Sequence, residues 1–202
     1  MTSLAQDKKV RLPSPRTKGT VSFEEALSKR GSVRSYSQAP LRMGEVSQLL
    51  WAAQGITREG WGRTAPSAGA TYPLEIYLVV NRVDGLESGV YHYLPGEHSL
   101  EIREVGEFGR RLRKAALGQE MLEEAAVNVV VAAVYGRTTA RYSGRGERYV
   151  HIEVGHVGQN IYLQAEALGL GTVAVGAFHD DGVKSLLGID EEVLYIMPVG
   201  RK

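Results

Sequence analysis

Apolar residues recur at helical spacing in several parts of the chain. Between residues 43 and 54, Val46, Leu49, Leu50 and Ala53 fall on one side of a helix. The segment Tyr149–Leu168 carries few charges for its length and is typical of a long, largely buried helix that ends at Gly169. The predicted helices cover Ser22–Lys29, Met43–Gln54, Glu107–Leu117, Met121–Ala125, Tyr149–Leu168 and Asp180–Leu187.

Shorter apolar runs, rich in β-branched and aromatic residues, indicate strands. The run Val127–Val134 is apolar almost throughout, so we expect it to be covered on both faces at the centre of a sheet. The predicted strands cover Leu74–Val80, a hairpin of Gly89–Leu94 and Ser99–Arg103, Val127–Val134, Thr172–Gly176 and Val193–Val199. No repeat or second-domain boundary interrupts the chain, which predicts an α+β (mixed α/β) domain around one mixed sheet.

Two segments lack apolar periodicity. Residues 1–20 carry five basic residues and two prolines, and we expect an N-terminal arm that precedes a domain of residues 21–202. The segment Arg137–Arg148 holds four arginines, two glycines and Tyr142, and we expect it to be a mobile loop over a site.

Composition narrows the chemistry. The 202 residues are 43% apolar and 23% charged, and a formal net charge of +1 gives no general attraction for nucleic acid. The absence of cysteine excludes disulfides, thiolate metal sites and cysteine nucleophiles. No apolar run is long enough to cross a membrane and no signal peptide is evident, so we expect a soluble, cytoplasmic protein.

The segment Arg30-Gly31-Ser32-Val33-Arg34 is the strongest candidate for chemistry. It follows the first predicted helix and directs two guanidinium groups and a hydroxyl into one small volume. Guanidinium forks match the geometry of a phosphate dianion, and the hydroxyl suits its neighbouring groups. We interpret this segment as a clamp for a phosphorylated cofactor.

Three further segments could approach a flat ligand. The loop Arg63–Pro73 is rich in small residues, with Ser67 and free amides that could hydrogen-bond a ring edge. Gly176 and Ala177 end a tight connection and could present bare backbone amides. The chain then finishes with Arg201 and Lys202, two cations after a buried strand.

A metal site on the long helix is not expected. His151, Glu153 and His156 include a His-x-Glu pattern, but the two histidines are five residues apart. At about 100° per residue they point roughly 140° away from each other, whereas two ligands on one helix need a spacing of three or four. Glu153 and His156 share a face, and we expect a buried pair across a dimer instead.

Taken together, these segments resemble the FMN-dependent nitroreductase family from Val21 to Lys202. Three stretches are most similar to the branch that includes the thiazoline/oxazoline dehydrogenases of peptide maturation. These stretches are Arg63–Pro73, Arg148–His156 and Gln159–Ala165.

The resemblance implies a three-layer sandwich that forms a domain-swapped homodimer with two FMN molecules at the interface. Arg30, Ser32 and Arg34 would hold the phosphate and ribityl chain, although Gly31 stands where relatives commonly carry an arginine or serine. The resemblance also implies Gly200, Arg201 and Lys202 near the phosphate and Gln119 at the ribityl chain. At the ring it implies the backbone amides of Gly176 and Ala177, together with a loop from the partner subunit that consists of Pro66, Ser67, Ala68 and Gly69. Trp61, Tyr142 and Arg145 are candidate substrate contacts.

The function that follows is hydride transfer from NAD(P)H through FMN to a nitroaromatic, quinone or similar acceptor. One alternative is an FMN-dependent dehydrogenase that oxidises azoline rings in a modified peptide. That branch is expected to carry a lysine–tyrosine pair before the long helix, where this chain has Arg141 and Tyr142. A further alternative is a non-catalytic module that binds flavin or nucleic acid.

Overall fold

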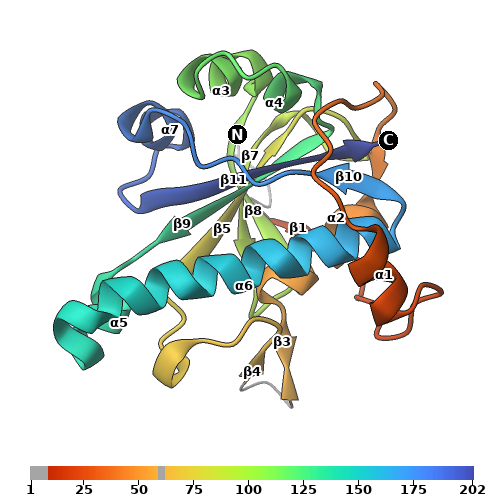
Figure 1. The fold of residues 1–202 in the computed structure, drawn as a ribbon. Coiled ribbons are helices and arrows are strands. Elements are labelled where there is room, and N and C mark those ends of the chain that lie inside the picture. Colours follow the sequence, from red (N-terminus) through yellow and green to blue (C-terminus); the bar gives the residue numbers. More distant parts are fainter. Residues whose placement is uncertain (1–8, 59–61) are drawn as a thin grey trace, which may run out of the picture.

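The computed structural model describes residues 9–58 and 62–202 (Figure 1). The strands are β1 (Lys9–Arg11), β2 (Leu41–Arg42), β3 (Ile56–Thr57), β4 (Gly62–Arg63), β5 (Leu74–Val80), β6 (Val83–Asp84), β7 (Gly89–Leu94), β8 (Ser99–Val105), β9 (Val127–Ala133), β10 (Leu170–Thr172) and β11 (Glu192–Arg201). The helices are α1 (Phe23–Lys29), α2 (Met43–Gln54), η2 (Ala68–Ala70), α3 (Gly109–Ala115), α4 (Met121–Glu124), α5 (Gly136–Tyr142), η3 (Ser143–Arg145), α6 (Gly146–Ala167) and α7 (Asp180–Leu187).

A seven-stranded sheet in the order β1-β8-β7-β5-β9-β11-β10 forms the middle layer. Every residue of β9 is buried and it pairs with β5 on one side and β11 on the other, which confirms its predicted position inside the sheet. Each pairing in this sheet is antiparallel, so the expectation of a mixed sheet was wrong. Continuous apolarity reveals that a strand is covered on both faces but carries no information about the direction of its neighbours.

Helices cover both faces of this sheet and complete a three-layer sandwich, as predicted (Figure 1). On one face α2 and α6 pack against side chains such as Leu78, Val129 and Met197. On the other face α3, α4 and α7 pack against the alternate side chains, among them Val79 and Val130. Because successive side chains of β5 and β9 point to opposite faces of the sheet, these two strands contribute to two separate hydrophobic cores.

The segment predicted to be a mobile loop, Arg137–Arg148, is helical instead. It contains most of α5, all of η3 and the start of α6. Gly146 is buried against Thr139, so close that a Cβ atom there would lie 2.6 Å from the Thr139 Cα. Tertiary packing of this kind stabilises short helices that show no apolar periodicity of their own.

The predicted strand Thr172–Gly176 is also displaced. β10 ends at Thr172, and beyond it only Val175 pairs, through an isolated bridge to Ile196. Residues 173–177 therefore form an extended connection toward α7, and Gly176 and Ala177 are exposed.

The N-terminal segment from Lys9 onward packs along the domain. β1 pairs with β8, the Ser47 hydroxyl donates to the Pro13 carbonyl at 2.5 Å, and Gln48 bonds both backbone polar groups of Arg16. Within the described part of the chain, no helix has both the length and the apolar character that crossing a membrane requires.

Candidate functional site

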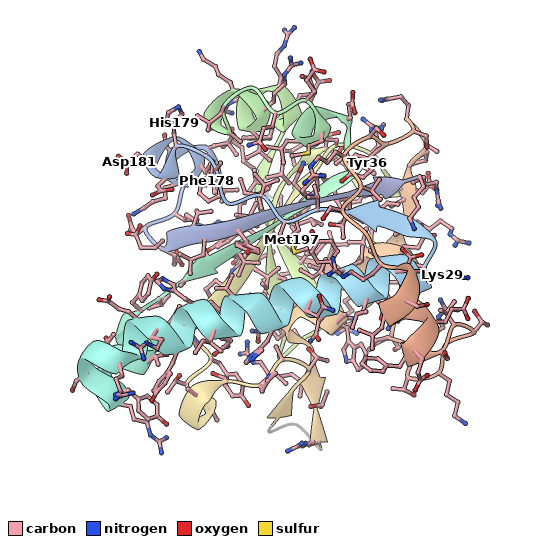
Figure 2. The ribbon with its side chains drawn as sticks, in the orientation of Figure 1. Lys29, Tyr36, Phe178, His179, Asp181 and Met197 are labelled. Carbon is pink, nitrogen blue, oxygen red and sulfur yellow. The ribbon has the colours of Figure 1, made fainter. Side chains whose placement is uncertain are left out.

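The segment that carries the arginine pair runs over the β10–β11 edge of the sheet. The Val33 amide donates to the Thr172 carbonyl at 2.9 Å. Two glycines allow this close approach, because a Cβ atom on Gly171 would lie 2.7 Å from Val33 and one on Gly200 would lie 2.8 Å from Tyr36. Figure 2 shows Tyr36 beside the C-terminal end of β11. The side chains of Val33 and Tyr36 therefore hold the segment against the sheet, and the side chains that alternate with them face solvent.

Arg30, Ser32 and Arg34 are these exposed alternate residues. The Ser32 hydroxyl lies 3.0 Å from the hydroxyl of Tyr162 on α6, and the Arg30 guanidinium lies 5.3 Å from the centre of the same ring. Within the described residues, neither Arg30 nor Arg34 forms an ion pair with a carboxylate. Two guanidinium charges thus flank a hydroxyl with no counter-charge, which is the composition of an anion site.

Tyr162 connects this segment to the connection after β10. Its hydroxyl accepts a hydrogen bond from the Ala174 amide at 2.9 Å. The hydroxyl of Thr172, the residue that pairs with Ser32, is buried and has no hydrogen-bond partner in the described structure. Sequence reasoning missed both residues, because nothing in the sequence links Tyr162 to a serine 130 positions away.

Arg201 and Lys202 lie near the same edge but are already paired. The Arg201 guanidinium donates to Glu45 at 2.9 Å and to the Pro40 carbonyl at 3.1 Å, and Lys202 pairs with Glu166 at 2.6 Å. Their charge is therefore partly neutralised within the chain, and they contribute less to an anion site than Arg30 and Arg34.

Gln119 and Ala177, predicted separately, are in direct contact. The Gln119 side-chain amide donates to the Ala177 carbonyl at 2.8 Å and to the Ala116 carbonyl at 2.9 Å. Within the described structure, the amide hydrogens of Gly176 and Ala177 donate to no protein acceptor. Gln119 thus fixes a turn that presents two free donors.

The loop Pro66–Gly69 lies on the opposite side of α6 from β10 and β11 (Figure 1). The Ser67 hydroxyl accepts from the Tyr72 amide at 2.9 Å, and Arg141 donates to the Gly69 carbonyl at 2.9 Å. Gly69 has a φ of 59°, and a Cβ atom there would lie 2.4 Å from the Tyr142 hydroxyl. The loop and the candidate substrate residue Tyr142 therefore form one surface.

The remaining candidates are Arg145, Trp61 and the Glu153–His156 pair. Arg145 is exposed in η3, and Trp61 lies outside the described residues. In the single chain Glu153 is buried whereas His156 is exposed, and their expected pairing across a dimer stays a prediction. His156 instead contacts the Pro66 carbonyl at 3.3 Å.

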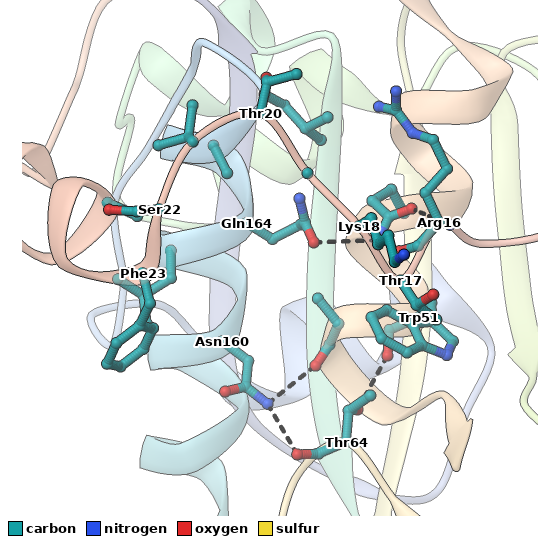
Figure 3. Close-up of a pocket in the computed structure, with 18 residues that line it drawn as sticks. Arg16, Thr17, Lys18, Thr20, Ser22, Phe23, Trp51, Thr64, Asn160 and Gln164 are labelled. Carbon is teal, nitrogen blue, oxygen red and sulfur yellow. Dashed lines mark hydrogen bonds between the residues drawn. The ribbon is translucent and has the colours of Figure 1, made fainter.

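A cavity of about 470 Å³ lies between the N-terminal segment, α1, α2 and α6 (Figure 3). Its walls include Phe23 and Trp51, and the side-chain amides of Asn160 and Gln164 reach it from α6. None of the predicted cofactor residues lines it. This cavity is thus separate from the candidate cofactor surfaces.

Comparison with known proteins identifies the family. Residues 27–201 match the family model described as the Nitroreductase family. The chain belongs to the nitroreductase family. Membership of this family indicates that the protein is an oxidoreductase, and the three-layer fold agrees with this assignment.

Three relatives show the range within this family. The chain is 52% identical over 182 residues to MJ1384 of Methanocaldococcus jannaschii, a protein named as a nitroreductase, covering 90% of this chain and 92% of the relative. A crystal structure from Ralstonia eutropha JMP134, also named as a nitroreductase, has a TM-score of 0.84 at 28% identity and covers 96% of this chain and 90% of its own.

The third relative is the microcin B17-processing protein McbC of Escherichia coli. It is 28% identical over 137 residues, which cover 65% of this chain and 50% of McbC. This similarity confirms the predicted resemblance to the peptide-processing branch of the nitroreductase family.

Proposed function

We propose that the protein is an FMN-dependent oxidoreductase that takes a hydride from NAD(P)H and reduces a nitroaromatic, a quinone or a similar small acceptor. One observation carries the proposal: Arg30 and Arg34 flank Ser32 at the sheet edge and have no carboxylate partner among the described residues. The orphaned Thr172 hydroxyl beneath them is a second sign that these residues fit a polar ligand.

Arg30, Ser32 and Arg34 hold the phosphate end of FMN. Guanidinium groups donate in a planar fork that matches phosphate oxygens, and the Tyr162 ring restrains Arg30 before the ligand arrives. The Ser32 hydroxyl can donate to the ligand, because Tyr162 can serve as its hydrogen-bond donor or acceptor. Arg201 adds positive charge from the end of β11, and Gln119 orients the Ala177 turn.

The backbone amides of Gly176 and Ala177 contact the ring end of the cofactor. Bound FMN supplies the hydride-accepting chemistry, and the overall cycle moves two electrons from NAD(P)H to the acceptor, which also gains protons. The free amide hydrogens of Gly176 and Ala177 are preorganised donors that stabilise negative charge where it develops. No acid or base of the chain needs to change protonation state in this scheme.

A second copy of the chain completes each site. The Arg30–Arg34 clamp and the Pro66–Gly69 loop lie on opposite sides of α6, so one chain cannot bring them to the same ligand (Figure 1). Phe23 on α1 and Ile152 on α6 are 64% and 49% exposed, and such large apolar side chains suit a contact between subunits. We therefore propose a homodimer with two composite FMN sites.

The clamp is tested with the double variant Arg30→Ala/Arg34→Ala. We expect the purified variant to be colourless and its affinity for FMN to fall by about a hundredfold or more, because two charge-assisted contacts are lost. The matched control Arg110→Ala/Lys114→Ala removes two exposed cations from α3 and should bind FMN normally. Equal flavin content in the two variants would contradict the clamp.

A second candidate function is the oxidation of azoline rings in a modified peptide. The similarity to McbC favours it, as does the position of Arg141 and Tyr142 against the Gly69 loop. In that reaction the ring loses two electrons and two protons to become aromatic, and oxygen takes them up as hydrogen peroxide. Anaerobic reduction of a nitroaromatic by NADH or NADPH would favour the first function, and peptide-dependent peroxide formation would favour the second.

A further inference from the structure

Glu153 is a buried carboxylate in the middle of α6 that the proposed function does not use. It is 2% exposed, and its Oε1 accepts a hydrogen bond from the Gln54 side-chain amide at 3.4 Å. Burial raises the pKa of the Glu153 carboxyl above its usual value. An apolar residue would fill this position without that desolvation, so the carboxyl is expected to have a role beyond packing.

Gln54 also contacts a half-buried arginine. Gln54 is fully buried on α2, and its Oε1 accepts from the Arg63 Nη1 at 3.0 Å. The Arg63 guanidinium in turn lies 4.6 Å from the centre of the Tyr72 ring. Arg63 and Tyr72 stand at the two ends of the loop that contains Pro66–Gly69, so this chain of contacts joins both ends to the core.

The centre of the loop also faces the same carboxyl. Ser67 lowers the pKa of Glu153 by hydrogen bonding, while its oxygen accepts the Tyr72 amide at 2.9 Å. Exposed side chains on α5 and α6 also contact the loop, namely Arg137, Arg141 and His156. Near its C-terminal end the hydroxyl of the buried Thr138 lies 2.8 Å from that of Thr71. Glu153 and Gln54 are therefore the buried anchor of its Arg63 end.

We propose that Glu153, acting through Gln54 and Arg63, is a positioning residue that holds the Pro66–Gly69 loop in the conformation that receives the FMN ring. The inference rests on the proposed function, since it assigns the loop to the cofactor. Glu153 needs only to accept a hydrogen bond, so its role does not depend on its charge. A glutamine can supply the same acceptor, whereas a leucine cannot.

The experiment compares four variants of the full-length protein in two assays. Gln54→Met and Glu153→Leu break the chain of contacts, and Glu153→Gln keeps the acceptor. Gln48→Met is the matched control, because Gln48 is a buried amide on the same helix that holds Arg16 rather than the loop. The assays are FMN binding by fluorescence quenching and hydrogen exchange of residues 64–73 in the FMN-free protein.

We expect Gln54→Met and Glu153→Leu to weaken FMN binding about tenfold and to speed exchange in residues 64–73. Glu153→Gln should remain within about threefold of wild type, and Gln48→Met should lower the melting temperature without either effect. The proposal is overturned if Gln48→Met weakens FMN binding as much as Gln54→Met, or if Glu153→Gln behaves like Glu153→Leu. If wild-type protein binds no FMN, the proposed function fails, and unchanged exchange in Gln54→Met would separately refute the anchor.

Discussion

Glu45 illustrates at the residue scale how this chain keeps a buried charge. Its side chain is almost fully enclosed at the start of α2, where Arg42 and Arg201 both reach it. Burial alone would raise the pKa of Glu45, but the hydrogen bonds from Arg42 and the charge of Arg201 together hold it below the usual value. Glu45 therefore ties the last residues of β11 to α2.

We predict that Glu45→Gln destabilises the protein by about 1–3 kcal/mol at pH 7, because two arginines lose their shared partner. Since the pKa of Glu45 is lower in the folded state, its contribution is present above the unfolded value and is lost as the pH falls through the folded one. Urea unfolding at several pH values should show a weaker loss of stability below pH ~4.5 in the variant than in wild type. Identical pH profiles would contradict this.

Individual candidate site residues could be chosen from the sequence, but their contacts within the chain could not. The spacing of Arg30, Ser32 and Arg34 was visible locally, as was the small-residue character of Pro66–Gly69. The pairing of Arg201 with Glu45 joins residues 156 positions apart, so no local pattern indicated that Arg201 is already engaged. Tyr162 was missed for the same reason.

At the scale of elements, the proposed clamp depends on how residues 30–36 pack against β10 and β11. Val33 and Tyr36 lie against Gly171 and Gly200, and any side chain at these glycines would displace the segment. The helices and strands with strong periodicity were predicted correctly, including α2, α7, β5 and the centre of β9. α5 was not, because its stability comes from packing against α6.

We predict that Gly200→Ala lowers stability by about 1–3 kcal/mol and weakens FMN binding, because the new methyl group would clash with Tyr36 and push the clamp outward. Gly96→Ala is the control, since nothing lies within 4 Å of its Cβ position. Thermal unfolding and FMN titration of both variants provide the measurement. A Gly200→Ala protein with wild-type stability would show that this contact is not tight.

At the scale of the whole molecule, the sandwich places the two halves of the proposed cofactor site on opposite sides of α6. α6 also carries the exposed Ile152, and we propose this helix as a contact between two subunits. The apolar patterns predicted helices around one sheet whose central strand is covered on both faces, and the family resemblance implied the three layers. The composite site was implied only by the family resemblance, because periodicity within one chain says nothing about a second copy.

We predict that Ile152→Asp yields a monomer near the 22.0 kDa chain mass, whereas wild type elutes at twice that mass. The variant should also lose FMN, because each site needs both subunits. Val105→Asp, which places the same charge at a similarly exposed apolar position on β8, should remain dimeric. Light scattering after size-exclusion chromatography distinguishes these outcomes, and a dimeric Ile152→Asp protein would rule out this surface.

The composite site is tested most directly by mixing two defective proteins. Arg30→Ala/Arg34→Ala lacks the clamp, and Gly69→Val deforms the ring loop through its left-handed φ and the Tyr142 clash. Each alone should bind no FMN. After joint unfolding and refolding in equal amounts, the account predicts flavin in about a quarter of the sites, because each mixed dimer regains one intact clamp and loop. A mixture as colourless as its components would contradict it.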